Sequence, residues 1–374
     1  MMEIYLDNAA TTYVSADVAK EVLKVMTKYY ANSSSKNSVG FKVSEEIEEA
    51  RKKIANYIGA KPSEIIFTSG ATESNNLAIR GVAMANPEKK HIITTAIEHA
   101  SVLETCFDLE KNGYYIDYID VDKGGLIDPK KIKDKIRKDT LLVSVMHANN
   151  EVGTVQFVEE IAKICSSKGV YFHSDAVQTF TKVKIDVSKT AFDLISVSGH
   201  KFHGPKGVGF LYVRSKVKIL PMVTGGGQEK NLRSGTLNSS GIIGMAKALD
   251  FKVDLKKVLD ARERIVEGLL RIKKSKLNGS SSKRLPGNIN VSFEGIDGEE
   301  LTSELSKKGI YVSNGSACSS IKSDVSHVLK ALGVEEKYLY GAIRLSFEEL
   351  GDKEIKYVVD SVGECVEKLR KEKL

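Results

Sequence analysis

The stretch that decides the fold is Ser196-Val-Ser-Gly-His-Lys-Phe-His-Gly-Pro-Lys-Gly207, together with the apolar run Phe192-Asp-Leu-Ile-Ser-Val197 that overlaps its start. The apolar run alternates little, which predicts a strand that is buried on both faces, as in a parallel sheet. Loops at the carboxyl edge of such a sheet are where open α/β folds bind ligands. We therefore expect Lys201 to lie at the ligand-binding edge of an α/β fold.

Lys201 is predicted to bind a cofactor covalently, although a lysine after a strand is more often a solvated surface charge. The neighbouring glycines allow close backbone approach, and Ser198 and His200 offer hydrogen-bond donors that suit a phosphate. The strand-like run Val170-Tyr-Phe-His-Ser-Asp175 ends in a carboxylate, which is the partner that the ring nitrogen of pyridoxal phosphate needs. Lys201 and Asp175 together predict a pyridoxal-phosphate site.

The composition is that of an ordinary globular protein. With 374 residues, 41% of them hydrophobic and 28% charged, the chain can form two domains and a large core. It has no apolar run of about 18 residues and no signal-peptide pattern, so we expect a cytoplasmic protein with no membrane partner. The net charge of +7 is spread over lysine-rich helical segments without interleaved aromatics, so direct nucleic-acid binding is not expected.

Strand and helix patterns alternate through the first two thirds of the chain. A helix is expected from Ser44, as its N-cap, to a stop at Gly59. The alternation after Gly59 predicts a large domain with a mostly parallel seven-stranded sheet flanked by helices. The expected strands are Glu64–Phe67, His91–Thr95, Tyr114–Ile119, Leu141–His147, Val170–Asp175, Leu194–Ser198 and Val208–Val213.

The strand and helix order restarts after a long helical stretch at Asp254–Ser275. Strands are expected at Asn288–Phe293, Ile310–Ser313 and Ala342–Phe347, with helices between them and a final helix after them. This second series predicts a smaller α/β C-terminal domain. We expect residues 15–255 to form the large cofactor-binding domain, and residues 1–14 and 256–374 to form the small domain.

Other candidate binding residues follow other predicted strands. The segment Phe67-Thr-Ser-Gly-Ala-Thr-Glu-Ser-Asn-Asn-Leu77 places glycine and hydroxyls before a helix, so Thr72 can bind an anion, unless this is an ordinary capped helix start. His99 can stack on a pyridine ring and shuttle protons. Asn150 can contact a ring hydroxyl or a carboxylate, and Arg344 can bind a carboxylate bidentately. The other histidines lack metal-ligand spacing, so no metal is expected.

The four cysteines are far apart and form no Cys-x-x-Cys motif, which argues against a disulfide framework or a zinc finger. Cys106, Cys165 and Cys365 occupy apolar positions of helical patterns and are expected to be buried. Cys318 lies among glycine and serine in Val312-Ser-Asn-Gly-Ser-Ala-Cys-Ser-Ser320, which favours an accessible thiol. Because a partly formed thiolate is a strong nucleophile, Cys318 is a candidate catalytic residue.

The chain resembles cysteine desulfurases of the NifS/IscS type, which are class V aminotransferases among the fold-type I pyridoxal-phosphate enzymes. The resemblance covers nearly the full length and implies conversion of L-cysteine to L-alanine, with the sulfur carried as a persulfide on Cys318. It also implies a sulfur acceptor such as an iron–sulfur scaffold protein or a tRNA-thiolation enzyme. The matching stretches are Tyr5–Thr12, Phe67–Leu77, Glu98–His99, His147–Gly153, Asp175–Gln178, Ser198–Gly209, Gly225–Thr236 and Gly315–Cys318.

The resemblance also implies a role for each matching site residue. Lys201 would bind pyridoxal phosphate, Asp175 would pair with its ring nitrogen, and His99 would stack on its ring. Gln178 would contact the ring hydroxyl, and Asn150 would also bind the cofactor. The residues that would bind the phosphate are Ala71, Thr72, Ser198, His200 and, from a neighbouring subunit, Thr236, which implies a homodimer. The residues that would bind the substrate carboxylate are Asn32, Asn150 and Arg344.

Some positions depart from the pattern of the resembled family. Serine replaces a usual proline in Asn32-Ser-Ser-Ser-Lys-Asn37, and Asn37 replaces a usual histidine. Tyr13 replaces a usual proline, and Glu348-Glu349 replaces a usual Gly-Arg. We expect these departures at the rim of the active site, where they would affect substrate affinity and partner docking.

Three other functions compete with cysteine desulfuration. A pyridoxal-phosphate transaminase or a selenocysteine lyase would use the same lysine, but transamination does not need a nucleophilic Cys318. A non-enzymatic sulfur-transfer scaffold would be expected to have lost Lys201, Asp175 or Cys318, and all three are present.

Overall fold

The computed structural model describes residues 2–314 and 325–372. Seven strands form one large sheet in the order β2-β8-β7-β6-β5-β3-β4. Of these, β3, β4, β5, β6 and β7 pair in parallel, whereas β8 runs antiparallel to both of its neighbours, β2 and β7. The mostly parallel seven-stranded sheet is therefore confirmed. Its strands are β2 (Ile65–Thr68), β3 (His91–Thr95), β4 (Tyr115–Ile119), β5 (Thr140–Ser144), β6 (Tyr171–Asp175), β7 (Leu194–Ser198) and β8 (Gly209–Val213).

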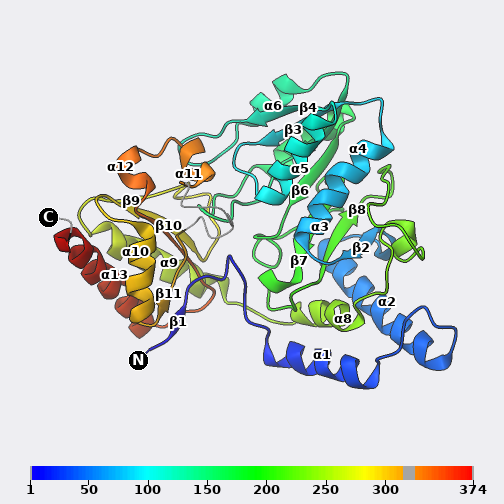
Figure 1. The fold of residues 1–374 in the computed structure, drawn as a ribbon, viewed down its shortest axis with the longest axis horizontal. Coiled ribbons are helices and arrows are strands. Elements are labelled where there is room, and N and C mark those ends of the chain that lie inside the picture. The colour runs from blue at the N-terminus through cyan, green and yellow to red at the C-terminus, as the bar shows by residue number, and fades with distance from the viewer. Residues whose placement is uncertain (1, 315–324, 373–374) are drawn as a thin grey trace.

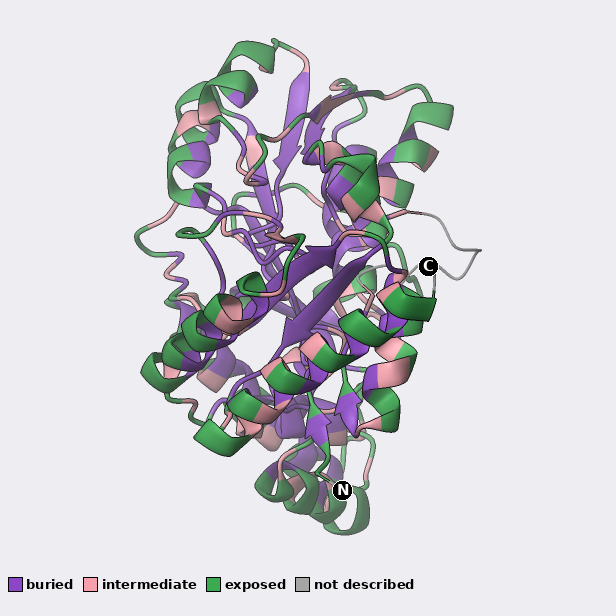
Figure 2. Cartoon of the chain, turned by 90° about the vertical axis from the view of Figure 1, so that its left-hand side faces the viewer, coloured by how far each residue is buried: buried purple, intermediate pink, exposed green. Residues whose placement is uncertain are grey.

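Helices cover both faces of this sheet, so the strands are buried between two helical layers (Figure 2). Because successive strand residues point to opposite faces, Ile65 and Phe67 pack in one core cluster and Ile66 packs in another. The first cluster includes residues of α1 (Ala16–Lys28), α2 (Ser38–Ile58), α6 (Pro129–Lys135), α7 (Val158–Lys168) and α8 (Ser239–Ala248). The second includes residues of α4 (Val82–Ala85), α5 (Ala100–Lys111) and the π-helical turn Leu77–Gly81, which follows α3 (Ala71–Asn76).

Helix α2 begins earlier than its sequence pattern predicts. Its N-cap is Asn37, whose Oδ1 accepts the Gly40 N–H at 2.9 Å, so the prediction of Ser44 as the cap was wrong. Asn37 caps the helix in the ordinary way, and the buried face of the helix already begins with Gly40 and Val43, upstream of Ser44. The predicted stop at Gly59 is confirmed, since this residue adopts a left-handed φ of 70°.

A second region has its own sheets and its own core. Strands β12 (Ala342–Ser346), β10 (Asn288–Phe293) and β9 (Ser275–Leu277) form an antiparallel sheet, and β1 (Ile4–Tyr5) pairs in parallel with β11 (Ile310–Tyr311). Helix α9 (Leu255–Leu270) ends before the predicted Ser275, because β9 begins there. The other helices are α10 (Gly298–Lys307), α12 (Glu336–Leu339) and α13 (Asp352–Glu372), whereas α11 (His327–Ala331) packs in a cluster with Ile97, Met146 and Val152.

The N-terminal strand belongs to this second region rather than to the large sheet (Figure 1). Ile4 and Leu6 pack in one core cluster with residues of α9, β10, α10, β12 and α13. The chain then crosses to α1, which packs against α8 under the large sheet. This separate core supports the proposed division into a small domain of residues 1–14 and 256–374 and a large domain of residues 15–255. Within the described residues, we find no helix with the length and apolarity needed to span a membrane.

Candidate active site

A cavity of about 470 Å³ lies at the carboxyl ends of β6 and β7, where the small-domain strand β12 meets the large sheet. Its volume falls in the range of small-molecule binding sites. It brings together most of the residues that the sequence predicts for the site, namely Ala71, Thr72, His99, Asn150, Asp175, Gln178, Ser198, His200, Lys201 and Arg344. Asn32 and Thr236 are exposed and do not line it. Cys318 lies outside the described residues.

Lys201 closes the 3-10 turn Gly199–Lys201 that follows β7, and this turn delivers its side chain to the cavity. Its Nζ donates hydrogen bonds to the carbonyl oxygens of Ala9 at 2.6 Å and Ala10 at 2.7 Å. A side chain at Gly204 would come within 2.8 Å of the Gly199 carbonyl oxygen, so the tight turn depends on glycine there. The sequence does not indicate these backbone partners of Lys201, because carbonyl acceptors occur at every residue.

The segment of residues 9–12, which supplies these carbonyl oxygens, is held by hydrogen bonds at both ends. Its Ala9 N–H donates to Ser346 Oγ at 2.8 Å, which ties the segment to the small domain. Its Thr12 N–H donates to the His200 carbonyl oxygen at 2.9 Å, which ties it to the turn that carries Lys201. The stretch Tyr5–Thr12, which resembles the family, thus contributes to the wall of the cavity.

A chain of hydrogen bonds joins Asp175 to His99. The Asn75 amide donates 2.8 Å hydrogen bonds from Nδ2 to Asp175 Oδ2 and to Ser101 Oγ, and Ser101 Oγ lies 2.8 Å from His99 Nδ1. The second Asp175 oxygen accepts the Val177 N–H at 3.0 Å. Sequence reasoning missed Asn75 and Ser101, because each belongs to a helix whose facing partner is known only from the fold.

The protonation of His99 follows from these contacts. Its Nδ1 also accepts the Ser101 backbone N–H at 3.1 Å, so this nitrogen is unprotonated and the neutral ring carries its hydrogen on Nε2. Burial lowers the pKa of His99, and the nearby Lys201 cation lowers it further against the opposing effect of Asp175. His99 is therefore neutral at neutral pH.

Two neighbouring groups also have shifted pKa values. Burial lowers the pKa of His200 to about 4, with Lys201 and Lys206 adding to the effect. Burial raises the pKa of Glu98 to about 8, although Oε1 accepts hydrogen bonds from the Thr95 hydroxyl and the Met146 N–H. Both groups are thus predominantly uncharged at neutral pH.

The opposite end of the cavity is shaped by glycine. Gly70 has a φ of 150°, and a side chain at Gly209 would come within 2.8 Å of the Gly70 Cα atom. The first-turn N–H groups of α3, which follows Gly70, have no acceptor within the helix. Ala71, Thr72 and Ser198 line the cavity beside this turn. The arrangement can bind an anion such as a phosphate.

Arg344 on β12 is buried, and its guanidinium is only partly paired. Nη2 donates to Asp7 Oδ1 at 2.6 Å, and Nη1 donates to the Asn150 carbonyl oxygen at 3.1 Å. Nε has no hydrogen-bond partner among residues 2–314 and 325–372. A buried donor without a partner is costly, which favours an added acceptor such as a substrate carboxylate. Sequence reasoning did not identify Asp7 as a partner of Arg344.

The predictions for three cysteines are confirmed. Cys106, Cys165 and Cys365 are buried. Burial raises the pKa of Cys106 and of Cys165 to about 12, and it also raises the pKa of Cys365. These thiols are therefore poor nucleophiles at neutral pH.

The family model of class-V aminotransferases matches residues 4–354. The chain belongs to the aminotransferase class-V family. This class-V chain is 47% identical over 374 residues to the cysteine desulfurase IscS of Methanosarcina thermophila, a match that covers 98% of the chain and 93% of that protein. It is 46% identical to the cysteine desulfurase IscS of Dictyoglomus turgidum, with 98% of the chain and 95% of that protein covered.

Solved structures lead to the same family. A NifS-like protein superposes on this class-V chain with a TM-score of 0.93 at 39% identity, covering 98% of the chain and 100% of the solved chain. The structure of SspA in complex with cysteine superposes with a TM-score of 0.84 at 38% identity, covering 92% of the chain and 99% of the solved chain. The NifS-like match confirms the predicted fold-type I architecture.

Proposed function

We propose that this class-V family member is a pyridoxal-phosphate-dependent cysteine desulfurase. It converts L-cysteine to L-alanine and moves the substrate sulfur to the Cys318 thiol, which becomes a persulfide. The observation that carries the proposal is the convergence of Lys201, Asp175 and Arg344 on one cavity. The names of the relatives in the sequence comparison and the cysteine bound in the solved SspA complex support the choice of substrate.

The cavity fits pyridoxal phosphate in the chemistry of its side chains. Lys201 supplies the amine that binds the cofactor, and buried Asp175 supplies the carboxylate for its ring nitrogen. Gln178 lines the cavity beside them, as a contact to the ring hydroxyl requires. The residues that bind the phosphate are Ala71, Thr72, Ser198 and His200. When bound, the cofactor supplies an electron sink for the substrate carbon that carries the amine.

The protein's own residues orient the substrate and move its protons. Arg344 binds the substrate carboxylate through Nε, the guanidinium nitrogen without a partner among the described residues, with Asn150 beside it. His99 carries its proton on Nε2 and donates it from that atom, because Ser101 occupies Nδ1. The hydrogen bonds through Asn75 keep Asp175 and His99 in fixed relation.

Cys318 is proposed as the sulfur acceptor from its sequence setting and from the residues that precede it. Ser313 pairs with Arg344, whose N–H donates to the Ser313 carbonyl oxygen at 2.6 Å. The chain therefore leaves the wall that carries Arg344 five residues before Cys318 in the sequence. The Cys318 sulfur attacks the sulfur of the substrate, so an S–S bond forms as the C–S bond of cysteine breaks. The Cys318 thiol loses one proton and the alanine methyl group gains one, and the products are one alanine and one Cys318 persulfide.

A homodimer and a protein acceptor complete the proposal. Leu220, Met222 and Val223 are 40–44% exposed, and the Val223 carbonyl accepts the Ser234 N–H, which brings this apolar segment close to Thr236. Contact between two copies covers these side chains and brings Thr236 to the phosphate site of the partner subunit. The persulfide then passes to an acceptor such as an iron–sulfur scaffold protein or a tRNA-thiolation enzyme. We place the reaction in the cytoplasm.

The proposal is tested by incubating the purified protein with pyridoxal phosphate, L-cysteine and a thiol reductant. The expected result is equal release of alanine and sulfide, with a dimer seen by light scattering. A transaminase instead forms a keto acid from cysteine when an acceptor keto acid is added. A strong preference for selenocysteine over cysteine would support a selenocysteine lyase instead.

A further inference from the structure

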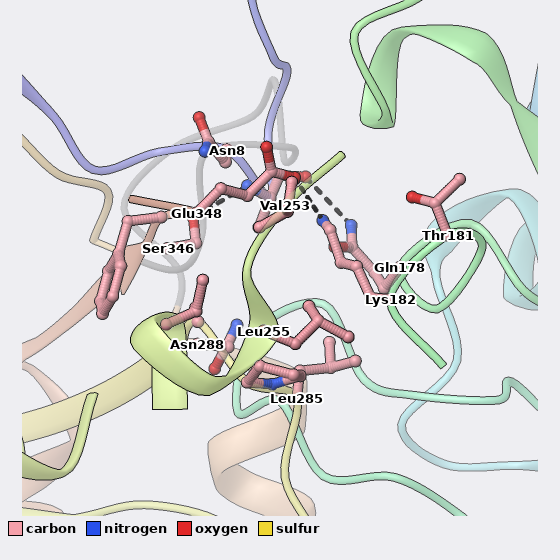
Figure 3. Close-up of a pocket in the computed structure, with 15 residues that line it drawn as sticks. Asn8, Gln178, Thr181, Lys182, Val253, Leu255, Leu285, Asn288, Ser346 and Glu348 are labelled. Carbon is pink, nitrogen blue, oxygen red and sulfur yellow. Dashed lines mark hydrogen bonds and ion pairs between the residues drawn. The ribbon is translucent and has the colours of Figure 1, made fainter. Parts of the chain in front are cut away.

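Glu348 of the small domain contacts two turns of the large domain. It follows β12 and is buried, with a side chain that is 10% exposed. Its Oε2 is hydrogen-bonded to His203 Nε2, and its Oε1 lies 3.8 Å from Lys182 Nζ. Figure 3 shows Glu348 facing Lys182 and Gln178 across the narrow cavity between the domains.

The two contacted turns carry predicted cofactor-binding residues. Lys182 follows Gln178 in one turn, and His203 follows Lys201 in the other. Both turns meet at the Ala9 carbonyl oxygen, which accepts hydrogen bonds from Gln178 Nε2 at 3.0 Å and from Lys201 Nζ at 2.6 Å. Glu348 therefore contacts the chain just beyond each of these residues.

Both turns contain a residue whose backbone conformation is unfavourable. Thr181 has a φ of 69° and His203 has a φ of 66°, and both are non-glycine residues in the left-handed region. Such conformations persist where the surrounding contacts over-determine them, and they concentrate at functional sites. The Glu348 carboxylate thus contacts His203, which has this conformation, and Lys182, which follows Thr181 in the chain.

His203 is held by backbone, side-chain and ring contacts. Its N–H donates to Thr12 Oγ1 at 2.7 Å, and its Nδ1 lies 3.0 Å from the Tyr13 carbonyl oxygen. Its ring contacts those of Tyr13 and Phe251, with centroid distances of 4.6 Å and 4.0 Å. Tyr13 and Glu348 both depart from the pattern of the resembled family, and the structure brings both to His203.

The charge on Glu348 depends on its partners. Burial opposes ionisation of the carboxyl group, but the hydrogen bond from His203 and the charge of Lys182 outweigh it and lower the pKa of Glu348. Burial also lowers the pKa of Lys182, against the effect of Glu348. Removing one member of a buried charged cluster leaves the others without compensation, so the contact is expected to be costly to break.

We propose that Glu348 is a positioning residue that fixes the turns carrying Gln178 and Lys201. Because Arg344 lies on β12, the strand that Glu348 follows, the contact also sets the distance between the substrate-binding arginine and the cofactor-binding lysine. This inference rests on the proposed role of Lys201, and its test is a measurement on the protein backbone that does not depend on turnover.

The test is hydrogen exchange of the cofactor-loaded protein, measured by mass spectrometry. Glu348→Gln keeps the size of the side chain and removes its charge, and Glu349→Gln is the matched control because Glu349 is exposed. We expect Glu348→Gln to speed exchange about tenfold or more in residues 179–183 and 199–204, without change in β3. The bound cofactor, followed by its visible absorption, should also dissociate about tenfold faster.

The proposal is wrong if Glu348→Gln exchanges like Glu349→Gln, or if exchange rises equally in β3 and in the two turns. Lys182→Met tests the same contact from the large domain, should Glu348→Gln fail to fold. It is expected to speed exchange in residues 179–183, and a wild-type rate there contradicts the proposal. If instead Lys201→Ala keeps full turnover, the proposed function fails, whatever the exchange pattern shows.

Discussion

The two walls of the cavity are built in different ways. On the large-domain wall, Asp175 ends β6 and Lys201 follows the neighbouring parallel strand β7, so one buried sheet sets their backbone positions. On the small-domain wall, Arg344 is held by Asp7 of its own domain and by the Asn150 carbonyl of the other. The cofactor side is therefore placed by one sheet, with contacts from Ala9, Ala10 and Glu348 added to it, whereas the substrate side depends on contacts between domains throughout.

The largest expected effect tests the cofactor wall. Lys201→Ala removes the amine that binds pyridoxal phosphate, so alanine formation from cysteine should fall by about 10³-fold or more. The sheet that carries the turn is complete without this side chain, so the variant should fold normally by circular dichroism. Alanine formation at the native rate would show that Lys201 is not the cofactor lysine.

A smaller effect is expected on the substrate wall. Arg344→Lys keeps the charge but loses the planar pair of donors, so KM for cysteine should rise about 10–100-fold while kcat changes less. Arg271→Lys, on an exposed part of the small domain, is the matched control. A normal KM with a reduced kcat would place Arg344 in another role.

The link between Asp175 and His99 should have a more modest effect. Ser101→Ala removes the hydroxyl that joins Asn75 to His99 Nδ1 but keeps the backbone N–H that contacts the same nitrogen. We expect kcat to fall about tenfold, because the ring is held by one donor instead of two. Ser167→Ala, on the exposed end of α7, should be unchanged. Equal kcat values for the two variants would show that the Ser101 hydroxyl does not contribute to turnover.

The smallest effect concerns stability behind the cofactor wall. The pKa of Glu98 is raised by burial from 4.5 to about 8, so its carboxyl favours the folded state below pH 4.5 and loses that contribution as pH rises through 8. Glu98→Gln should therefore become more stable relative to the wild type, by up to a few kcal/mol, between about pH 5 and pH 8. Urea unfolding at several pH values measures the difference in the free energy of unfolding between the two proteins. A difference that does not change with pH would show that Glu98 is not a buried, neutral acid.

The cofactor wall was largely predictable from the sequence. Parallel strands deliver their carboxyl ends to one edge, so Asp175 and Lys201 could be expected together before the structure was known. The positions of Thr72, His99 and Arg344 in the same cavity follow the same logic of strand ends and helix starts.

The contacts between elements were not predictable in this way. The carbonyls of Ala9 and Ala10 carry no side-chain signal, and Glu348 was recognised only as a departure from a family pattern. Its pairing with His203 and Lys182 depends on how the domains meet. Short edge strand β9 was missed because three residues give too short a pattern for a period to show.

The central claim is that sulfur from cysteine moves to Cys318, and one measurement tests it directly. The cofactor-loaded protein is exposed briefly to L-cysteine without reductant, the free thiols are blocked, and its peptides are analysed by mass spectrometry. We predict one added sulfur on the peptide that contains Cys318 and none on those of buried Cys106, Cys165 and Cys365. Cys318→Ser should keep the cofactor and lose alanine production. Added sulfur only on the three buried cysteines, or normal turnover by Cys318→Ser, would contradict the account.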